Sequence, residues 1–166
     1  MKSFNPIRRL ALHAGLLASA ALLSTGALAQ ADDASKSAEA VLNSWIQSFN
    51  LGEPTRRFFT SDATLVRGNG VFVGAERIDA MEQRESRAGL RLALKVQRAE
   101  RLSTDSVWAL AEYELTIPGK DGAAAQVVPG MSMHVLQRQS GTWQMKAASF
   151  TRVQAPAPQV AGTGQN

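Results

Sequence analysis

The chain has 166 residues, of which 18 are Lys or Arg and 14 are Asp or Glu, and it contains no Cys. The lack of Cys excludes disulfides, a lipid-modified Cys and a thiol nucleophile. Basic residues are scattered among acidic ones, which argues against a nucleic-acid partner, and a single His after residue 29 argues against a metal site. We therefore expect no cofactor, no metal and no nucleic acid.

Residues 1–29 have the pattern of a secretory signal peptide. Lys2, Arg8 and Arg9 precede an apolar stretch from about residue 10 to residue 23, and small residues end in Ala27-Leu28-Ala29. The stretch is shorter than the ~20 residues that a membrane-spanning helix needs, which favours cleavage after Ala29 over a membrane anchor. Cleavage leaves 15 basic residues against 14 acidic ones. We expect a periplasmic protein that has no membrane association once its leader is removed.

After a polar leader at residues 30–34, an amphipathic helix is predicted. Its apolar residues recur at helical spacing: Ala38, Val41, Leu42, Trp45, Ile46 and Phe49. Asp33 or Ser35 is suited to cap its start, and Gly52 to end it, because glycine tolerates the left-handed conformation found there.

Residues 53–60 are predicted to form a short second helix, since Pro54 is tolerated in a first helical turn. Phe58 and Phe59 are adjacent and cannot face the same way. We expect one of them in the core and the other at a rim or cavity.

A β-hairpin and a third helix follow. Residues 63–67 and 71–73 are predicted strands around the tight turn Gly68-Asn69-Gly70. The helix over residues 75–88 places Ile78 and Met81 on its apolar side, with Glu82 and Glu85 largely on the polar side.

A long strand begins at Leu90. Its alternating pattern slips after Val96, which predicts a β-bulge and hence a bend.

Three apolar runs, residues 107–117, 127–136 and 143–150, predict an antiparallel meander. We expect the odd-numbered side chains from Val107 onward, including Tyr113 and Met133, to face the core. His134 is then expected on the outer face. Residues 154–166 contain too few apolar residues to order, and they predict a disordered tail.

The order of elements predicts an α+β fold with helices on one face of a curved sheet. Over residues 35–153 the chain resembles the nuclear transport factor 2-like superfamily, in particular SnoaL-like and ketosteroid-isomerase-like exported proteins of unknown function. The resemblance is carried by the segments that end the first helix, open the first hairpin, open the third helix and close the meander: Trp45, Phe49 and Gly52; Phe58-Phe59 with Ser61-Asp62-Ala63-Thr64-Leu65; Gly70 to Gly74 with Glu76 and Ile78; and Gly141-Thr142-Trp143-Gln144-Met145.

The resemblance implies a cone-shaped half barrel, a curved mixed or antiparallel sheet with three helices packed on its concave face around an apolar pocket. It also implies a possible homodimer through the convex face, where Trp108, Leu110 and Leu136 are expected. Some members catalyse isomerisation, dehydration or cyclisation of hydrophobic compounds and others only bind, so the fold does not decide the function.

Ketosteroid-isomerase chemistry needs a carboxylate base and two acidic hydrogen-bond donors. In our alignment these three positions are Arg67, Trp45 and Met133, and none supplies the required group. An enzyme on this fold would need a different base, such as Tyr113 or His134. Glu112 and Glu114 lie on the side away from Tyr113, so we expect them to be solvated or at a dimer interface.

We therefore expect a domain that binds a small apolar or amphipathic molecule. The predicted ligand-binding residues are Trp45, Phe49, Phe58, Arg67, Met81, Tyr113 and Met133. Arg67 would orient a carboxylate or another oxyanion. Its alternative role is that of an edge-strand residue that reaches solvent or pairs with an acid. The aromatic and Met side chains have the alternative of being plain core. An enzyme and a dimeric interaction module remain alternative functions.

Overall fold

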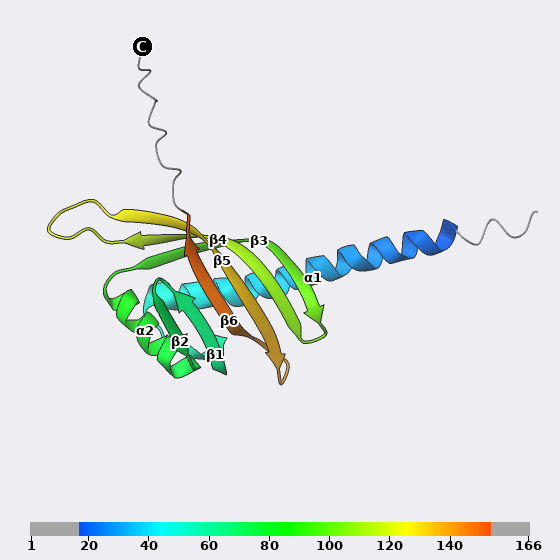
Figure 1. Cartoon of the computed structure of the whole chain (residues 1–166), viewed down its shortest axis with the longest axis horizontal. Coiled ribbons are helices and arrows are strands. Elements are labelled where there is room, and N and C mark those ends of the chain that lie inside the picture. Colours follow the sequence, from blue (N-terminus) through cyan, green and yellow to red (C-terminus); the bar gives the residue numbers. More distant parts are fainter. Residues whose placement is uncertain (1–16, 154–166) are drawn as a thin grey trace, which may run out of the picture.

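The computed structural model describes residues 17–153, with side chains from Asp33 onward. Over this range an α+β fold combines two α-helices and a six-stranded sheet (Figure 1). Its elements are α1 (Leu17–Leu51), the 3-10 turn η1 (Arg56–Phe58), β1 (Phe59–Arg67), β2 (Gly70–Val73), α2 (Ala75–Arg87), β3 (Arg91–Ser103), β4 (Ser106–Ile117), β5 (Gln126–Gln139) and β6 (Thr142–Arg152). Most of the predicted leader, residues 1–16, and the predicted tail, residues 154–166, lie outside the described residues.

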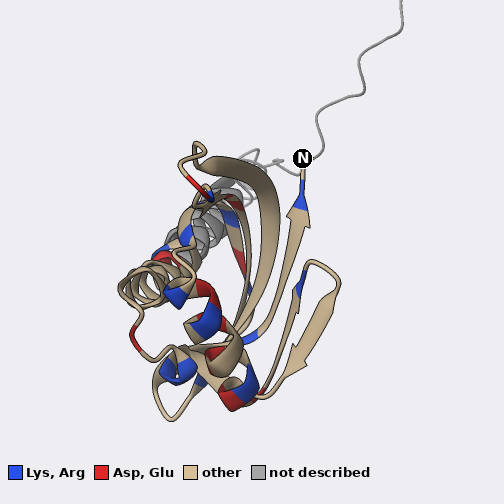
Figure 2. Ribbon diagram, turned by 90° about the vertical axis from the view of Figure 1, so that its left-hand side faces the viewer, with Lys and Arg blue, Asp and Glu red and all other residues tan. Residues whose placement is uncertain are grey.

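The sheet has the strand order β2-β1-β6-β5-β4-β3. All neighbouring strands run antiparallel except β1 and β6, which are parallel. Seen from the side, the strands curve around the helices, and basic and acidic positions are interspersed on those helices (Figure 2). The concave face of the sheet is therefore the one that the helices cover.

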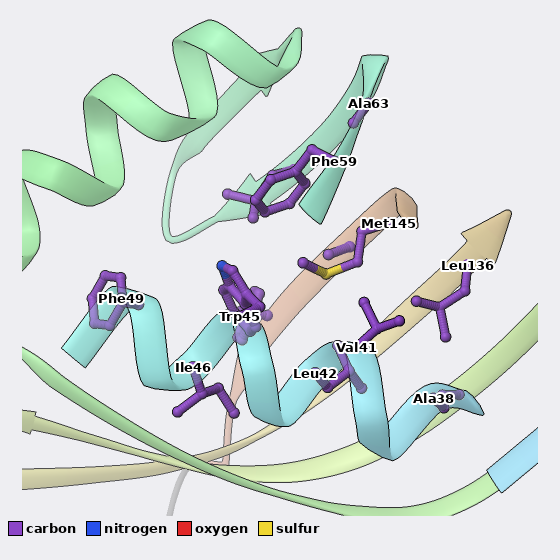
Figure 3. Close-up of a cluster of buried hydrophobic side chains, with 14 of the residues drawn as sticks. Ala38, Val41, Leu42, Trp45, Ile46, Phe49, Phe59, Ala63, Leu136 and Met145 are labelled. Carbon is purple, nitrogen blue, oxygen red and sulfur yellow. The ribbon is translucent and has the colours of Figure 1, made fainter. Parts of the chain in front are cut away.

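Helix α1 packs its apolar stripe against this concave face. The stripe is almost completely buried and consists of Ala34, Ala38, Val41, Leu42, Trp45, Ile46 and Phe49. These side chains meet Phe59 and Ala63 of β1, Leu136 of β5 and Met145 of β6 (Figure 3). A spacing of three and four residues keeps one face of the helix on the sheet, so this stripe supplies much of the core.

The C-terminal end of α1 is fixed by two devices. Gly52 has a φ of 74° and donates to the Phe49 carbonyl, while Glu53 donates to the Ser48 carbonyl, as the predicted glycine cap requires. Asn50 then exchanges two hydrogen bonds of 2.8 Å with the backbone of Leu92 in β3. The last turn of the helix, which carries Phe49, is thereby held to the edge of the sheet.

The predicted count of three helices is not confirmed. The second helix, expected over residues 53–60, is the single 3-10 turn η1, because Phe59 already pairs with Met145 as part of β1 and leaves too few residues for an α-helix. Helix α1 begins before Asp33 and Ser35, so neither residue caps its start, and Asp33 pairs with Arg101 instead. Within the described residues, no helix has both the length and the hydropathy needed to cross a membrane.

The strand pattern was predicted correctly in β3 and β4. A register shift between Val96 and Arg98 is the predicted bulge, and the odd-numbered side chains of β4 from Val107 to Leu115 are buried. Glu112 and Glu114 are exposed, as expected.

In β5 the predicted phase was wrong. The β4–β5 hairpin pairs Ile117 with Gln126, so odd residues of β4 face even residues of β5, and cross-strand partners share one face of a sheet. His134 and Leu136 are therefore fully buried on the concave side, whereas Met133 is 48% exposed on the convex side. The sequence analysis predicted His134 and Leu136 on the outer face and Met133 on the inner face. All three predictions were wrong.

Candidate functional site

Buried polar groups gather around Phe150 in β6, on the concave side of the sheet. The ring of Phe150 lies 5.1 Å from the guanidinium carbon of Arg67, 5.2 Å from the Tyr113 ring and 5.6 Å from the His134 ring. The Trp45 ring lies 6.2 Å from it on the helix side. We call these five residues the Phe150 cluster.

Arg67 reaches the cluster from the end of β1, where its backbone is paired with Phe150 of β6 and Gly70 of β2. Its side chain is only 9% exposed, and the guanidinium is also 5.6 Å from the centroid of the Phe49 ring. Nη1 donates to Glu85 Oε2 at 2.7 Å, but the buried Nη2 has no hydrogen-bond partner. Arg67 thus pairs with an acid, as one of its two predicted roles requires, and its Nη2 is a buried donor without a partner.

Strand β1 is not an edge strand, because β2 and β6 flank it. The predicted alternative of an edge-strand residue is therefore wrong for Arg67, although its pairing with an acid is found. Burial raises the pKa of Glu85, and the charge of Arg67 opposes that rise.

His134 is enclosed by Trp45 and Phe150 and is fully buried. Its Nε2 lies 3.0 Å from Ser132 Oγ, while its Nδ1 is buried without a partner. Burial lowers the pKa of His134 to about 4, so the imidazole is neutral at physiological pH. A second polar atom without a partner therefore lies beside the same phenyl ring.

Glu82 of α2 is a titratable group that the sequence analysis assigned to the wrong face. It is 1% exposed, and both of its carboxylate oxygens accept from Trp45 Nε1, at 3.2 and 3.0 Å. Burial raises the pKa of Glu82 to about 7, against the effect of hydrogen bonds from Thr55 and Trp45 and of the charge of Arg67. Its spacing of four residues from Ile78 was the available signal, since residues i and i+4 share a helix face.

Helix α2 is positioned so that Glu82 points inward. Asp79 Oδ1 accepts hydrogen bonds from the backbone N–H groups of Thr55 and Arg56, which ties the helix to η1. Ile78 and Met81, one turn before Glu82 and next to it, are buried in the core.

Tyr113 is held by Gly130 and Phe150. A Cβ at position 130 would lie 2.4 Å from two atoms of the Tyr113 ring, so only glycine leaves room for the ring there. Tyr113 also lines a hollow of about 450 Å³ over β3, β4 and β5, together with Leu94 and Met131. The tyrosine therefore stands between this hollow and Phe150.

Of the seven predicted ligand-binding residues, the structure brings five together. Trp45, Phe49, Arg67 and Tyr113 meet in or beside the Phe150 cluster, and Met81 lies in the same core. Phe58 is half-buried and lines a separate hollow, while its neighbour Phe59 is core, so the predicted division between the two is found. Met133 lies on the opposite face of the sheet. Within residues 33–153, no group of acidic and His side chains is arranged to hold a metal ion.

No protein-family profile matches the sequence, and no curated protein matches it. Solved structures do share its fold. A ketosteroid isomerase-like protein from Erwinia carotovora has 16% identity and a TM-score of 0.63, over 73% of this chain and 97% of that chain. A candidate scytalone dehydratase from Novosphingobium aromaticivorans has 10% identity and a TM-score of 0.62, over 82% and 89%.

A protein of unknown function from Shewanella oneidensis, described as similar to nuclear transport factor 2, has 11% identity and a TM-score of 0.58, over 69% of this chain and 96% of that chain. At such low identities the similarity shows the fold alone. The predicted nuclear transport factor 2-like fold is thereby confirmed.

Proposed function

We propose that this chain, which has the nuclear transport factor 2-like fold, is an exported domain that binds a small, mainly apolar molecule with an anionic group. The observation that carries the proposal is the Nη2 atom of Arg67, a buried donor of a charged group without a partner. Buried polar atoms are almost always hydrogen-bonded, so an unpaired one in a native fold is a candidate contact for a bound molecule. An oxyanion matches the charge and the planar fork of a guanidinium.

The surroundings of Arg67 favour an apolar body for such a ligand. The rings of Phe49 and Phe150 both lie close to the guanidinium. The rings of Tyr113 and Trp45 in turn contact Phe150. Few polar groups amid aromatic walls are typical of small-molecule sites. We propose the hollow beside Tyr113 as the entrance, because Tyr113 contacts both the hollow and Phe150.

The test is calorimetric titration of the purified protein with acetate, benzoate and 2-naphthoate. The affinity is expected to rise with the apolar area of the acid, because each carboxylate is the same. Arg67→Met keeps an unbranched apolar stem and removes the guanidinium. It should lower the affinity for the tightest-binding of these acids at least tenfold, since a charge-assisted hydrogen bond is lost.

Two variants act as controls for this titration. Arg67→Met combined with Glu85→Gln removes the guanidinium without leaving its carboxylate partner unpaired, and it should bind as weakly as the single variant. Arg98→Met changes an exposed arginine of β3 and should leave the affinity unchanged. Equal affinity in the wild type and in both Arg67 variants, or no binding of any of the acids, would overturn the proposal.

The second candidate function is an enzyme that moves a proton on a hydrophobic compound, as an isomerase, cyclase or dehydratase does. It is favoured by two buried groups beside Trp45: Glu82, whose pKa of about 7 suits a general acid or base, and His134, whose neutral ring is a free base. Tyr113 is a third candidate. If Glu82→Gln, His134→Phe and Tyr113→Phe all turn over the true substrate at the wild-type rate, this function is removed.

A dimeric interaction module is the third candidate, through the convex face. Strand pairing places Leu110, Met133, Val66 and Val71 in one row that crosses five strands and is interrupted only by Ser149 of β6. Three of these side chains are at least 38% exposed. Apolar patches of this kind mark interaction sites.

A further inference from the structure

A second hollow, of about 680 Å³, lies where α1, η1 and the β5–β6 turn meet. None of its lining residues belongs to the Phe150 cluster. Its volume falls in the range of ~300 to 1,000 Å³ that is typical of small-molecule sites. Its lining combines apolar side chains with two cations and contains no acidic residue.

Two half-buried aromatic side chains from different elements line this hollow, Phe58 of η1 and Trp143 at the start of β6. Val41 contributes a further apolar side chain from α1 to the lining. Flat apolar walls of this kind favour an aromatic or other planar body, because aromatic rings pack well against one another.

Trp143 is held in place by charged neighbours. The guanidinium carbons of Arg101 and Arg138 lie over its ring, 5.9 and 5.4 Å from the centroid. Each arginine is in turn paired with an acid, Arg101 with Asp33 and Arg138 with Asp105. The indole is thus fixed before any ligand arrives, which reduces the entropy cost of binding.

Lys36 of α1 and Arg57 of η1 supply the positive charge of the lining. The guanidinium of Arg57 stacks 4.8 Å from the Phe58 ring, and its Nη2 donates to Ser48 Oγ at 2.9 Å. Its contact with Glu53, at 3.7 Å, joins two largely exposed side chains and is weak. Arg57 can therefore exchange this weak contact for one with an anion, and Lys36 lines the same hollow.

We propose that this hollow binds a small amphipathic anion, with an aromatic body between Phe58 and Trp143 and a carboxylate, sulfonate or phosphate facing Lys36 and Arg57. The aromatic walls account for the body, and Lys36 and Arg57, in a lining without an acidic residue, account for the charge. The site is independent of the proposed Arg67 site, because the two share no residue.

The test uses 8-anilinonaphthalene-1-sulfonate, a fluorescent aromatic anion, and its uncharged counterpart N-phenyl-1-naphthylamine. We expect one bound probe molecule at this site. Lys36→Glu combined with Arg57→Glu should weaken the sulfonate at least tenfold and change the affinity of the uncharged probe less than threefold. Phe58→Ala should lower the affinity for both probes, because it removes one aromatic wall of the hollow.

Three controls separate this site from other surfaces. Lys95→Glu, at the hollow over β3 to β5, and Arg98→Met, at an exposed position of β3, should both leave the sulfonate affinity unchanged. Circular dichroism of each variant checks that the fold is kept. If the charge-reversal variant and Phe58→Ala both bind the sulfonate like the wild type, the proposal is overturned. Loss only in Arg67→Met would also overturn it and would place the probe in the Phe150 cluster.

Discussion

Glu82 and His134 are expected to shape the pH dependence of stability in opposite directions. The pKa of Glu82 rises from 4.5 to about 7 in the fold, so the folded state holds a proton that the unfolded state releases. This contribution to stability is full below pH 4.5 and is lost as the pH rises to about 7. At 1.36 kcal/mol per pKa unit the loss is about 3 kcal/mol.

His134 acts in the reverse sense. Its pKa falls from 6.5 to about 4, so the unfolded state binds a proton that the folded state excludes. Its stabilising effect is full above pH 6.5 and is lost as the pH falls to about 4, again by about 3 kcal/mol. Between pH 4.5 and 6.5 one contribution falls as the other rises, so their pH dependences nearly cancel in the wild type.

Replacing Glu82 by Gln should expose this cancellation. The amide keeps an acceptor for the Trp45 indole and cannot ionise, so the variant should differ little from the wild type at pH 4.5. At pH 7.5 it should be more stable by about 3 kcal/mol, because the cost of a buried charge is gone. The difference in free energy of unfolding, rather than either value alone, removes the contributions of all other groups.

The assay is urea unfolding followed by tryptophan fluorescence at pH 4.5, 5.5, 6.5 and 7.5. Glu114→Gln, an exposed glutamate of β4, is the matched control and should give a difference near zero at every pH. The reasoning would be refuted by a Glu82→Gln difference that stays constant across this range. Destabilisation by Glu82→Gln at pH 7.5 would refute it as well, since the charged form would then be the favoured one.

Three further predictions concern other parts of the fold. Gly130→Ala should cost about 1–3 kcal/mol in urea unfolding, because the new Cβ meets the Tyr113 ring and the fixed Thr151 carbonyl; a neutral effect would contradict the packing. Met133→Glu should abolish any dimer in sedimentation at high concentration without loss of fold; a wild type that is strictly monomeric would count against the convex interface. The intact mass of the protein recovered from the periplasm should correspond to a chain that begins at Gln30; an uncleaved chain would contradict the leader assignment.

The sequence predicted the fold largely because local rules determined it. The period of the α1 stripe, the glycine at position 52 and the slip after Val96 each have one structural consequence, and each was found. The face to which β5 side chains point depends instead on how many residues the β4–β5 loop contributes to the pairing. Alternation alone does not fix that number, so Met133 and His134 were each predicted on the wrong face of the sheet.

The site was predicted in part for the same reason. Trp45, Phe49 and Tyr113 follow from the helix period and the strand alternation, whereas Arg67 was selected through the family resemblance. Glu82 was missed because a carboxylate is expected on the wet face of a helix, although its spacing from Ile78 places it inside. Thr55, Trp45 and the charge of Arg67 make its burial tolerable, and all three lie far away in the sequence.

Native mass spectrometry of the protein as purified tests the Arg67 proposal most directly. We predict that the wild type carries a small acidic molecule and that Arg67→Met, purified from the same host in the same buffer, has lost it, while Arg98→Met retains it. A wild type that carries no molecule, or an Arg67→Met variant that retains the same molecule to the same extent, would contradict the account.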